Sequence, residues 1–213
     1  MVKNWIGALI VVVLIIGGCN KKSSEAYRIL TQAEIESIKA NVQSLPDVPV
    51  SENEQAVVQT NLGIIEFEFY PDVAPNHCAN FKKLANAGFY DGTTFHRVIP
   101  NFVIQGGDIL SRDDNPANDG TGDAGYNLDA EFSTLHHDRG IVSTAREGGD
   151  INSAGTQFFI CVAPIRHLDG QYTIFGKVTK GMEVVDKIVN VPRDNNDKPL
   201  KKVVMEQVRV IEK

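Results

Sequence analysis

Residues 95–108 read FHRVIPNFVIQGGD, and this stretch carries the clearest structural signal in the chain. Aromatic and β-branched residues, which favour strands, stand on both sides of Pro100, a residue typical of turns. The pattern predicts two short strands, over residues 94–99 and 102–106. Alternation along the first strand places Arg97 on the opposite face from His96.

Short strand patterns recur on both sides of this stretch. Within residues 64–69, Ile65, Phe67 and Phe69 alternate with two glutamates, and this period of two predicts a strand with one buried face. The other predicted strands are at residues 55–59, 140–144, 157–163, 173–178 and 203–211. Helices are predicted over residues 72–87 and 182–189. Many short strands with two separated helices predict a mainly β fold, a closed antiparallel barrel whose ends the helices cover.

The first 18 residues predict a secretory signal peptide. Lys3 is followed by an apolar run from Trp5 to Gly18, which is shorter than the roughly 20 residues that span a bilayer. The run ends in Ile16-Gly17-Gly18-Cys19, which resembles the bacterial lipobox. That resemblance implies cleavage before Cys19, an acyl anchor on Cys19, and a domain held at the bacterial cell envelope outside the cytoplasm. An uncleaved anchor or an ordinary secreted protein is the alternative.

Residues 19–54 are predicted to be a lipid-anchored tether with a short helix. Thr31-Gln32-Ala33-Glu34 is a capping-box pattern, and Ile35 and Val42 follow at helical spacing. These features predict a helix over residues 32–44 that ends before Pro46. We expect a spacer that packs loosely or not at all on the following domain; a partner-binding helix is the alternative.

Composition excludes several classes of protein. The chain has 213 residues, with 21 Lys and Arg against 27 Asp and Glu, and a formal net charge of −6. That length suits one domain with a sizeable core, which we place at residues 55–213. The acidic balance argues against nucleic-acid binding, which needs clustered basic side chains. Three cysteines are too few for a disulfide scaffold.

The usual catalytic and metal-binding groups lack the pattern that they need. Ser143 has no G-x-S-x-G context, and Cys78 and Cys161 fall at apolar positions, where we expect buried core thiols. Residues 136–138 (His-His-Asp) suggest a metal cluster, but adjacent side chains point apart, so a solvated loop is expected. Residues 113–123 lack the Gly and Glu positions of a calcium loop. The sequence therefore predicts neither a metal nor a cofactor.

Three motifs together resemble those of one family. Besides residues 95–108, these are GTQFFI at residues 155–160 and LDGQYTIFGKV at residues 168–178. In this order they resemble the cyclophilin family of peptidyl-prolyl cis–trans isomerases, over residues 57–210. The resemblance implies a closed, eight-stranded antiparallel barrel capped by two helices.

The resemblance also implies a site. Arg97 matches the catalytic arginine, Gln105 the glutamine that supports it, and Phe102 the pocket for a proline ring. The other residues implied in substrate binding are His96, Val103, Ala145, Gln157, Phe159, His167, Leu168 and Tyr172. Many family members have Trp where this chain has His167, Met where it has Val103, and Asn where it has Arg146. These departures bear on ligand preference more than on the reaction.

The implied activity is rotation of X–Pro bonds in exported chains, which assists their folding. The implied partners are proline-containing polypeptides, with no nucleic acid and no cofactor, and we expect a monomer. The alternative is a proline-binding scaffold or holdase whose isomerase activity is incidental. Arg97 favours the enzyme, because a module that only binds proline does not need it.

Overall fold

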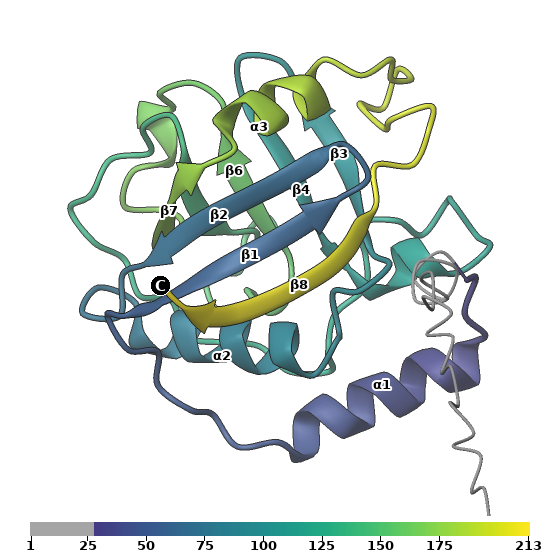
Figure 1. Ribbon diagram of the computed structural model, residues 1–213, viewed down its shortest axis with the longest axis horizontal. Coiled ribbons are helices and arrows are strands. Elements are labelled where there is room, and N and C mark those ends of the chain that lie inside the picture. Colours follow the sequence, from purple (N-terminus) through teal and green to yellow (C-terminus); the bar gives the residue numbers. More distant parts are fainter. Residues whose placement is uncertain (1–27) are drawn as a thin grey trace, which may run out of the picture.

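The computed structural model describes residues 28–213, so the predicted signal peptide and Cys19 lie outside the described residues. One antiparallel sheet of eight strands curls around the core, in the order β3-β4-β6-β5-β7-β2-β1-β8 (Figure 1). The strands are β1 (Glu54–Thr60), β2 (Gly63–Phe69), β3 (Thr94–Ile99), β4 (Val103–Asp108), β5 (Ile141–Thr144), β6 (Phe158–Cys161), β7 (Ile174–Lys180) and β8 (Met205–Glu212). Their bounds lie within two residues of the predicted ones.

The curled sheet is a half-barrel and not the closed barrel that the sequence predicts. β8 pairs along its length with β1, and β3 pairs with β4, so β3 and β8 are the two edges. These edges meet at one isolated bridge, between Thr94 and Val204, with the Phe95 amide donating to the Val203 carbonyl at 2.9 Å. The predicted full closure of the barrel is therefore not shown, because the pairing between the two edges is limited to residues 203–205 with residues 92–95.

Two helices cover the sheet as predicted. α2 (Pro75–Asn86) packs against β8 and β7, and α3 (Met182–Val189) packs against β2. The main core lies between the curled sheet and these helices, and its largest fully buried side chains include Phe67, Phe95 and Phe158. Cys78 and Cys161 are buried and free, as the sequence predicts.

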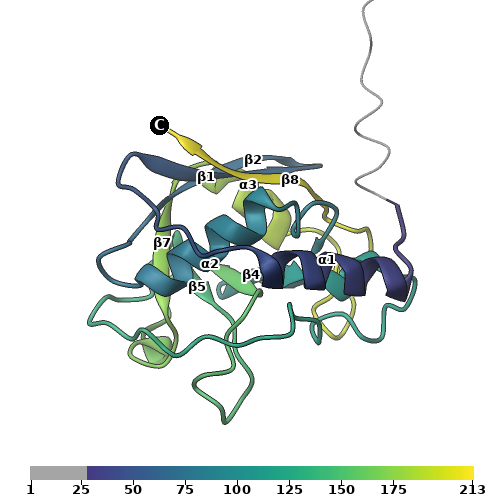
Figure 2. The same cartoon turned by 90° about the horizontal axis from the view of Figure 1, so that it is seen from below.

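A third helix, α1 (Gln32–Ser44), lies on the same side of the molecule as α2 (Figure 2). The predicted capping box is present, because the Thr31 side chain accepts from the Glu34 amide while Glu34 accepts from the Thr31 amide. Ile35 and Val42 are fully buried and belong to the main core cluster. The prediction of a loosely packed spacer is therefore wrong.

No helix within residues 28–213 is long and apolar enough to cross a membrane.

Candidate active site

Arg97 and Gln105 stand opposite each other on neighbouring strands. β3 and β4 form a hairpin in which these two residues are register partners, with a register irregularity just before Arg97. Arg97 Nη1 donates to Gln105 Oε1 at 3.2 Å. The pairing follows from the spacing in residues 95–108, since the turn at Pro100 brings the two positions together. This hydrogen bond fixes the direction of one of the five N–H donors of the guanidinium.

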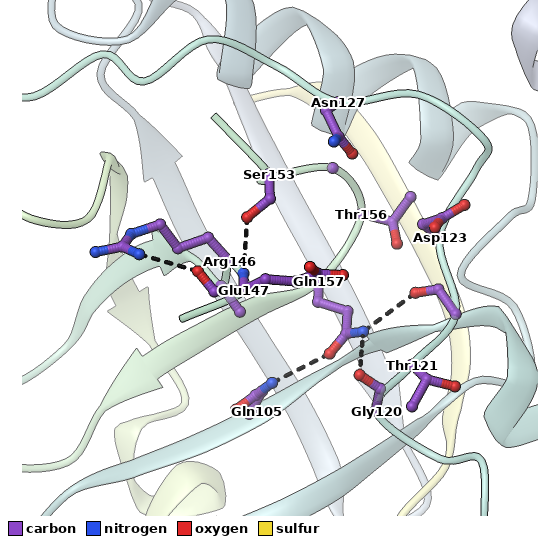
Figure 3. A pocket seen from close by; sticks show the side chains of 13 residues that line it. Gln105, Gly120, Thr121, Asp123, Asn127, Arg146, Glu147, Ser153, Thr156 and Gln157 are labelled. Carbon is purple, nitrogen blue, oxygen red and sulfur yellow. Dashed lines mark hydrogen bonds between the residues drawn. The ribbon is translucent and has the colours of Figure 1, made fainter. Parts of the chain in front are cut away.

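Gln157 extends this contact into a line of amide hydrogen bonds (Figure 3). Gln105 Nε2 donates to Gln157 Oε1 at 3.1 Å. Gln157 Nε2 in turn donates to the carbonyl oxygens of Gly120 and Gly122, at 2.9 and 3.1 Å. Each amide accepts from one neighbour and donates to the next, so the loop carbonyls orient both glutamines and, through them, Arg97.

An apolar cavity of about 120 Å³ opens beside Arg97. Its lining residues are Arg97, Phe102, Val103, Gln105, Ala145, Arg146, Phe159, Leu168 and Tyr172. Beneath it lies a second buried cluster, which is separate from the main core and includes Val103, Phe159 and Leu168. A positive charge thus stands at the rim of a small pocket with apolar walls.

A second cavity, of about 300 Å³, shares Gln105, Ala145 and Arg146 with the first (Figure 3). One wall is formed by residues 119–125, which we call the wall loop and whose Gly120, Thr121, Gly122 and Asp123 line the cavity. The opposite wall is the segment 145–157. The two cavities form one groove that passes over Gln105.

The structure brings most of the predicted site residues together. Eight of the eleven line the smaller cavity, and Gln157 is hydrogen-bonded to one of them. The exposed His167 ring lies parallel to Phe102, with centroids 5.9 Å apart and planes 4° from parallel. His167 therefore covers the outer face of Phe102 at the mouth of the cavity.

His96 is the exception. It is buried beside the apolar cavity and not among the residues that line it. Burial lowers the pKa of the imidazole to about 4, and nearby Asp119 opposes this. Neither ring nitrogen has a hydrogen-bond partner among the described residues. His96 instead lines an open cavity on the other side of Arg97, together with Gln105 and Gly120.

Arg146 contributes to the site in a way that the sequence analysis missed. Its guanidinium lies 4.7 Å from the centroid of the Tyr172 ring, and its Nε donates to the Gln171 carbonyl at 3.0 Å. It lines both cavities and brings a second cation to the groove. Tyr172 lies far along the chain, and no local pattern around Arg146 points to it.

His137 was also missed, because the solvated-loop interpretation of residues 136–138 is wrong for it. Its side chain is fully buried, with Nδ1 3.0 Å from Asp169 Oδ1 and Nε2 3.2 Å from Ser143 Oγ. The Ser143 hydroxyl donates to the Thr173 carbonyl, so it is not a free nucleophile. The imidazole stacks on Phe159 at 6.0 Å between centroids, and this network supports the cavity wall.

Fold and site together define a class of protein, a half-barrel with a small pocket beside an oriented, positively charged side chain. A family model for "Cyclophilin type peptidyl-prolyl cis-trans isomerase/CLD" matches residues 55–210. A solved cyclophilin type isomerase of Cryptosporidium parvum, studied in the presence of the dipeptide Ala-Pro, has a TM-score of 0.69 and 33% identity. That match covers 75% of this chain and 99% of the other.

Two curated relatives, one bacterial and one fungal, resemble the chain over most of the matched domain. Peptidyl-prolyl cis-trans isomerase B of Bacillus subtilis is 49% identical over 128 residues, which cover 59% of this chain and 83% of the relative. Peptidyl-prolyl cis-trans isomerase-like 2 of Gibberella zeae is 40% identical over 161 residues, which cover 73% of this chain but 26% of that longer protein. The chain belongs to the cyclophilin-type peptidyl-prolyl cis-trans isomerases.

Proposed function

We propose that this chain accelerates rotation about X–Pro bonds with Arg97 as the electrostatic catalyst. The observation that carries the proposal is the Arg97 guanidinium at the rim of the apolar cavity, oriented by Gln105. Uncatalysed rotation must break amide resonance, a barrier of roughly 18–20 kcal/mol. In the twisted transition state the proline nitrogen recovers its lone pair. A nearby N–H donor therefore stabilises the transition state more than either ground state.

The apolar cavity supplies the second requirement, which is to hold the proline ring while the preceding carbonyl turns. Phe102, Phe159 and Leu168 offer apolar surface, Arg146 lines the same cavity, and the His167 ring lies parallel to Phe102. The relative from Cryptosporidium parvum was studied with Ala-Pro, which supports a prolyl ligand for this pocket. Proline-containing polypeptides are therefore the proposed partners, bound by a monomer without nucleic acid.

The test is an X–Pro isomerisation assay on the full chain and on Arg97→Ala. Losing one preorganised donor is expected to lower kcat/KM by about 10²- to 10³-fold. The matched control is Arg28→Ala, an exposed arginine paired with Glu34, which should keep wild-type activity. Near-wild-type turnover in a folded Arg97→Ala protein would overturn the catalytic role of Arg97. Absence of turnover in the wild-type chain would instead favour the alternative, a proline-binding scaffold or holdase.

We also propose that the protein is an acylated bacterial lipoprotein whose clients are exported chains. The support is the sequence alone, a basic start and an apolar run followed by Gly17-Gly18-Cys19. Mass spectrometry of the N-terminal peptide from native membranes should show acylated Cys19 at the mature N-terminus. Retained Met1, or an unmodified N-terminus elsewhere, would contradict the proposal.

A further inference from the structure

We infer that α1, through Gln43, is a positioning element for the active site: it holds the wall loop in place, and the wall loop orients Gln157, Gln105 and Arg97. The inference rests on the proposed catalytic role of Arg97. α1 lies outside the 55–210 segment that matches the family model, so the family assignment does not account for its contacts.

The first step is the contact between α1 and the wall loop. Gln43 Nε2 donates to the Ala124 carbonyl at 2.6 Å, and Lys39 Nζ lies 3.7 Å from Asp123 Oδ1. Gly125 allows this approach, because a Cβ there would collide with the Gln43 amide. Ala124 is fully buried in the cluster that also holds Val42. The helix thus contacts the wall loop through apolar packing, one hydrogen bond and one ion pair.

The second step is the anchoring of the wall loop on its other side. The Gly120 amide donates to Asp108 Oδ2, and Gly122 lies so close to Asp108 that a Cβ there would overlap the carboxylate. The loop is therefore fixed from within by Asp108, at the end of β4, and from outside by Gln43. Loss of the Gln43 hydrogen bond leaves the outer side of the loop held only by the packing of Ala124 and the partly exposed Lys39–Asp123 pair.

The third step runs from the wall loop to the reacting groups. The carbonyls of Gly120 and Gly122, which belong to the part of the wall loop held by Asp108 and lie two to four residues before Ala124, accept both hydrogen bonds of Gln157 Nε2 (Figure 3). Gln157 accepts from Gln105, which accepts from Arg97. A shift of the two carbonyls would release the Gln157 amide and, through Gln105, the fixed orientation of the guanidinium.

Variants at Gln43 in the full-length chain test the inference. Gln43→Ala removes the donor, and Gln43→Glu places a carboxylate against the Ala124 carbonyl. Both are expected to lower kcat/KM by about three- to tenfold, the scale of one hydrogen bond. Gln43→Lys restores a donor beside Asp123 and should stay within about twofold of wild type. Gln43 is exposed, so all three proteins should fold.

The matched controls are Gln32→Ala and Gln32→Glu, at the exposed start of the same helix, where the side chain bonds only Glu36. A second readout follows the side-chain amide signals of Gln157 and Gln105 in ¹H–¹⁵N spectra. These signals should shift or broaden in Gln43→Ala and Gln43→Glu, and stay in place in the Gln32 variants.

A lower melting temperature with unchanged kcat/KM and unchanged amide signals would overturn the inference and leave α1 as a stabilising element alone. An inactive wild-type protein would instead overturn the proposed function, while the amide signals would still show whether Gln43 is coupled to Gln105.

Discussion

At the scale of single residues, the Arg97 guanidinium is oriented by the hydrogen bonds that link it to its neighbours. The sequence could predict Arg97, Gln105 and Phe102 because they match the motif of a known family, and the hairpin register makes Arg97 and Gln105 partners. Arg146 and His137 were missed because Tyr172, Phe159 and Asp169, which they contact, come from other segments. Residue-scale prediction thus succeeded where a family motif includes the residue, as for Phe159 and Leu168, and failed where only a contact between separate segments shows the role.

Asp108 is expected to make the free energy of unfolding depend on pH. Burial raises the pKa of its carboxyl to about 6, although the amides of Leu110 and Gly120 oppose this by donating to it. The unfolded carboxyl has a pKa near 3.8, so the folded state binds the proton more tightly. The resulting contribution to the free energy of unfolding is fully present below about pH 4 and is lost as pH rises through about 6.

Asp108→Asn removes this titration. The unfolding free energy of Asp108→Asn, measured relative to wild type by urea titration, should rise between about pH 4 and 6, by at most about 1.4 kcal/mol per pH unit. His96, whose lowered pKa acts in the opposite direction, is present in both proteins and cancels in the difference. A difference that is constant with pH would show that Asp108 does not titrate in this range.

At the scale of an element, the bounds of α1 could be predicted from the sequence, but its packing on the domain could not. Its bounds, residues 32–44, were predictable because the capping box and the apolar spacing are local signals. The packing of α1 could not be predicted, because the residues that it contacts, Ala124 and Asp123, lie about eighty positions further along the chain. Nothing in the sequence near the helix identifies them. The helix has few apolar positions, and only Ile35 and Val42 are buried.

The buried Val42 gives a direct test of this packing. Val42→Ala removes two methyl groups from a fully buried site and should lower the free energy of unfolding by about 1–3 kcal/mol. Val48→Ala is the same change in the same segment at a half-exposed site and should cost less than about 0.5 kcal/mol. Equal effects of the two changes, measured by denaturant unfolding, would restore the interpretation of α1 as a loose spacer.

At the scale of the whole molecule, the sequence predicted the strands but not how their edges meet. Burial alternates along β2, whereas β5 and β6 are buried at every position, so each strand has its own local signal. Closure depends instead on how far β3 and β8 converge. The fold places both chain ends of the sheet side by side, since β1 pairs with β8. Formation of the complete sheet therefore requires contacts between residues at opposite ends of the domain.

The alkylation rates of two buried thiols can show whether the domain unfolds cooperatively. Cys78 on α2 and Cys161 on β6 belong to different buried clusters, and burial raises each thiol pKa to about 12. Alkylation requires a thiolate and access, so both should react at least about a thousandfold slower than in denaturant. For cooperative unfolding the two rates, followed by peptide mass spectrometry, should agree within about threefold. A much faster Cys78 would instead indicate local opening of α2.

If Cys19 is acylated as proposed, the docking of α1 also limits how far the domain can move from the membrane. The Leu30 amide donates to the Arg112 carbonyl at 2.9 Å, so the docked part of the chain begins there. From the proposed anchor at Cys19 to Leu30, even a fully extended chain spans roughly 40 Å, against roughly 125 Å for a free tether that reached residue 55. The volume open to the domain is then about thirtyfold smaller, because volume scales with the cube of this reach. With Cys19 acylated as proposed, the domain would therefore be confined to a thin layer next to the bilayer.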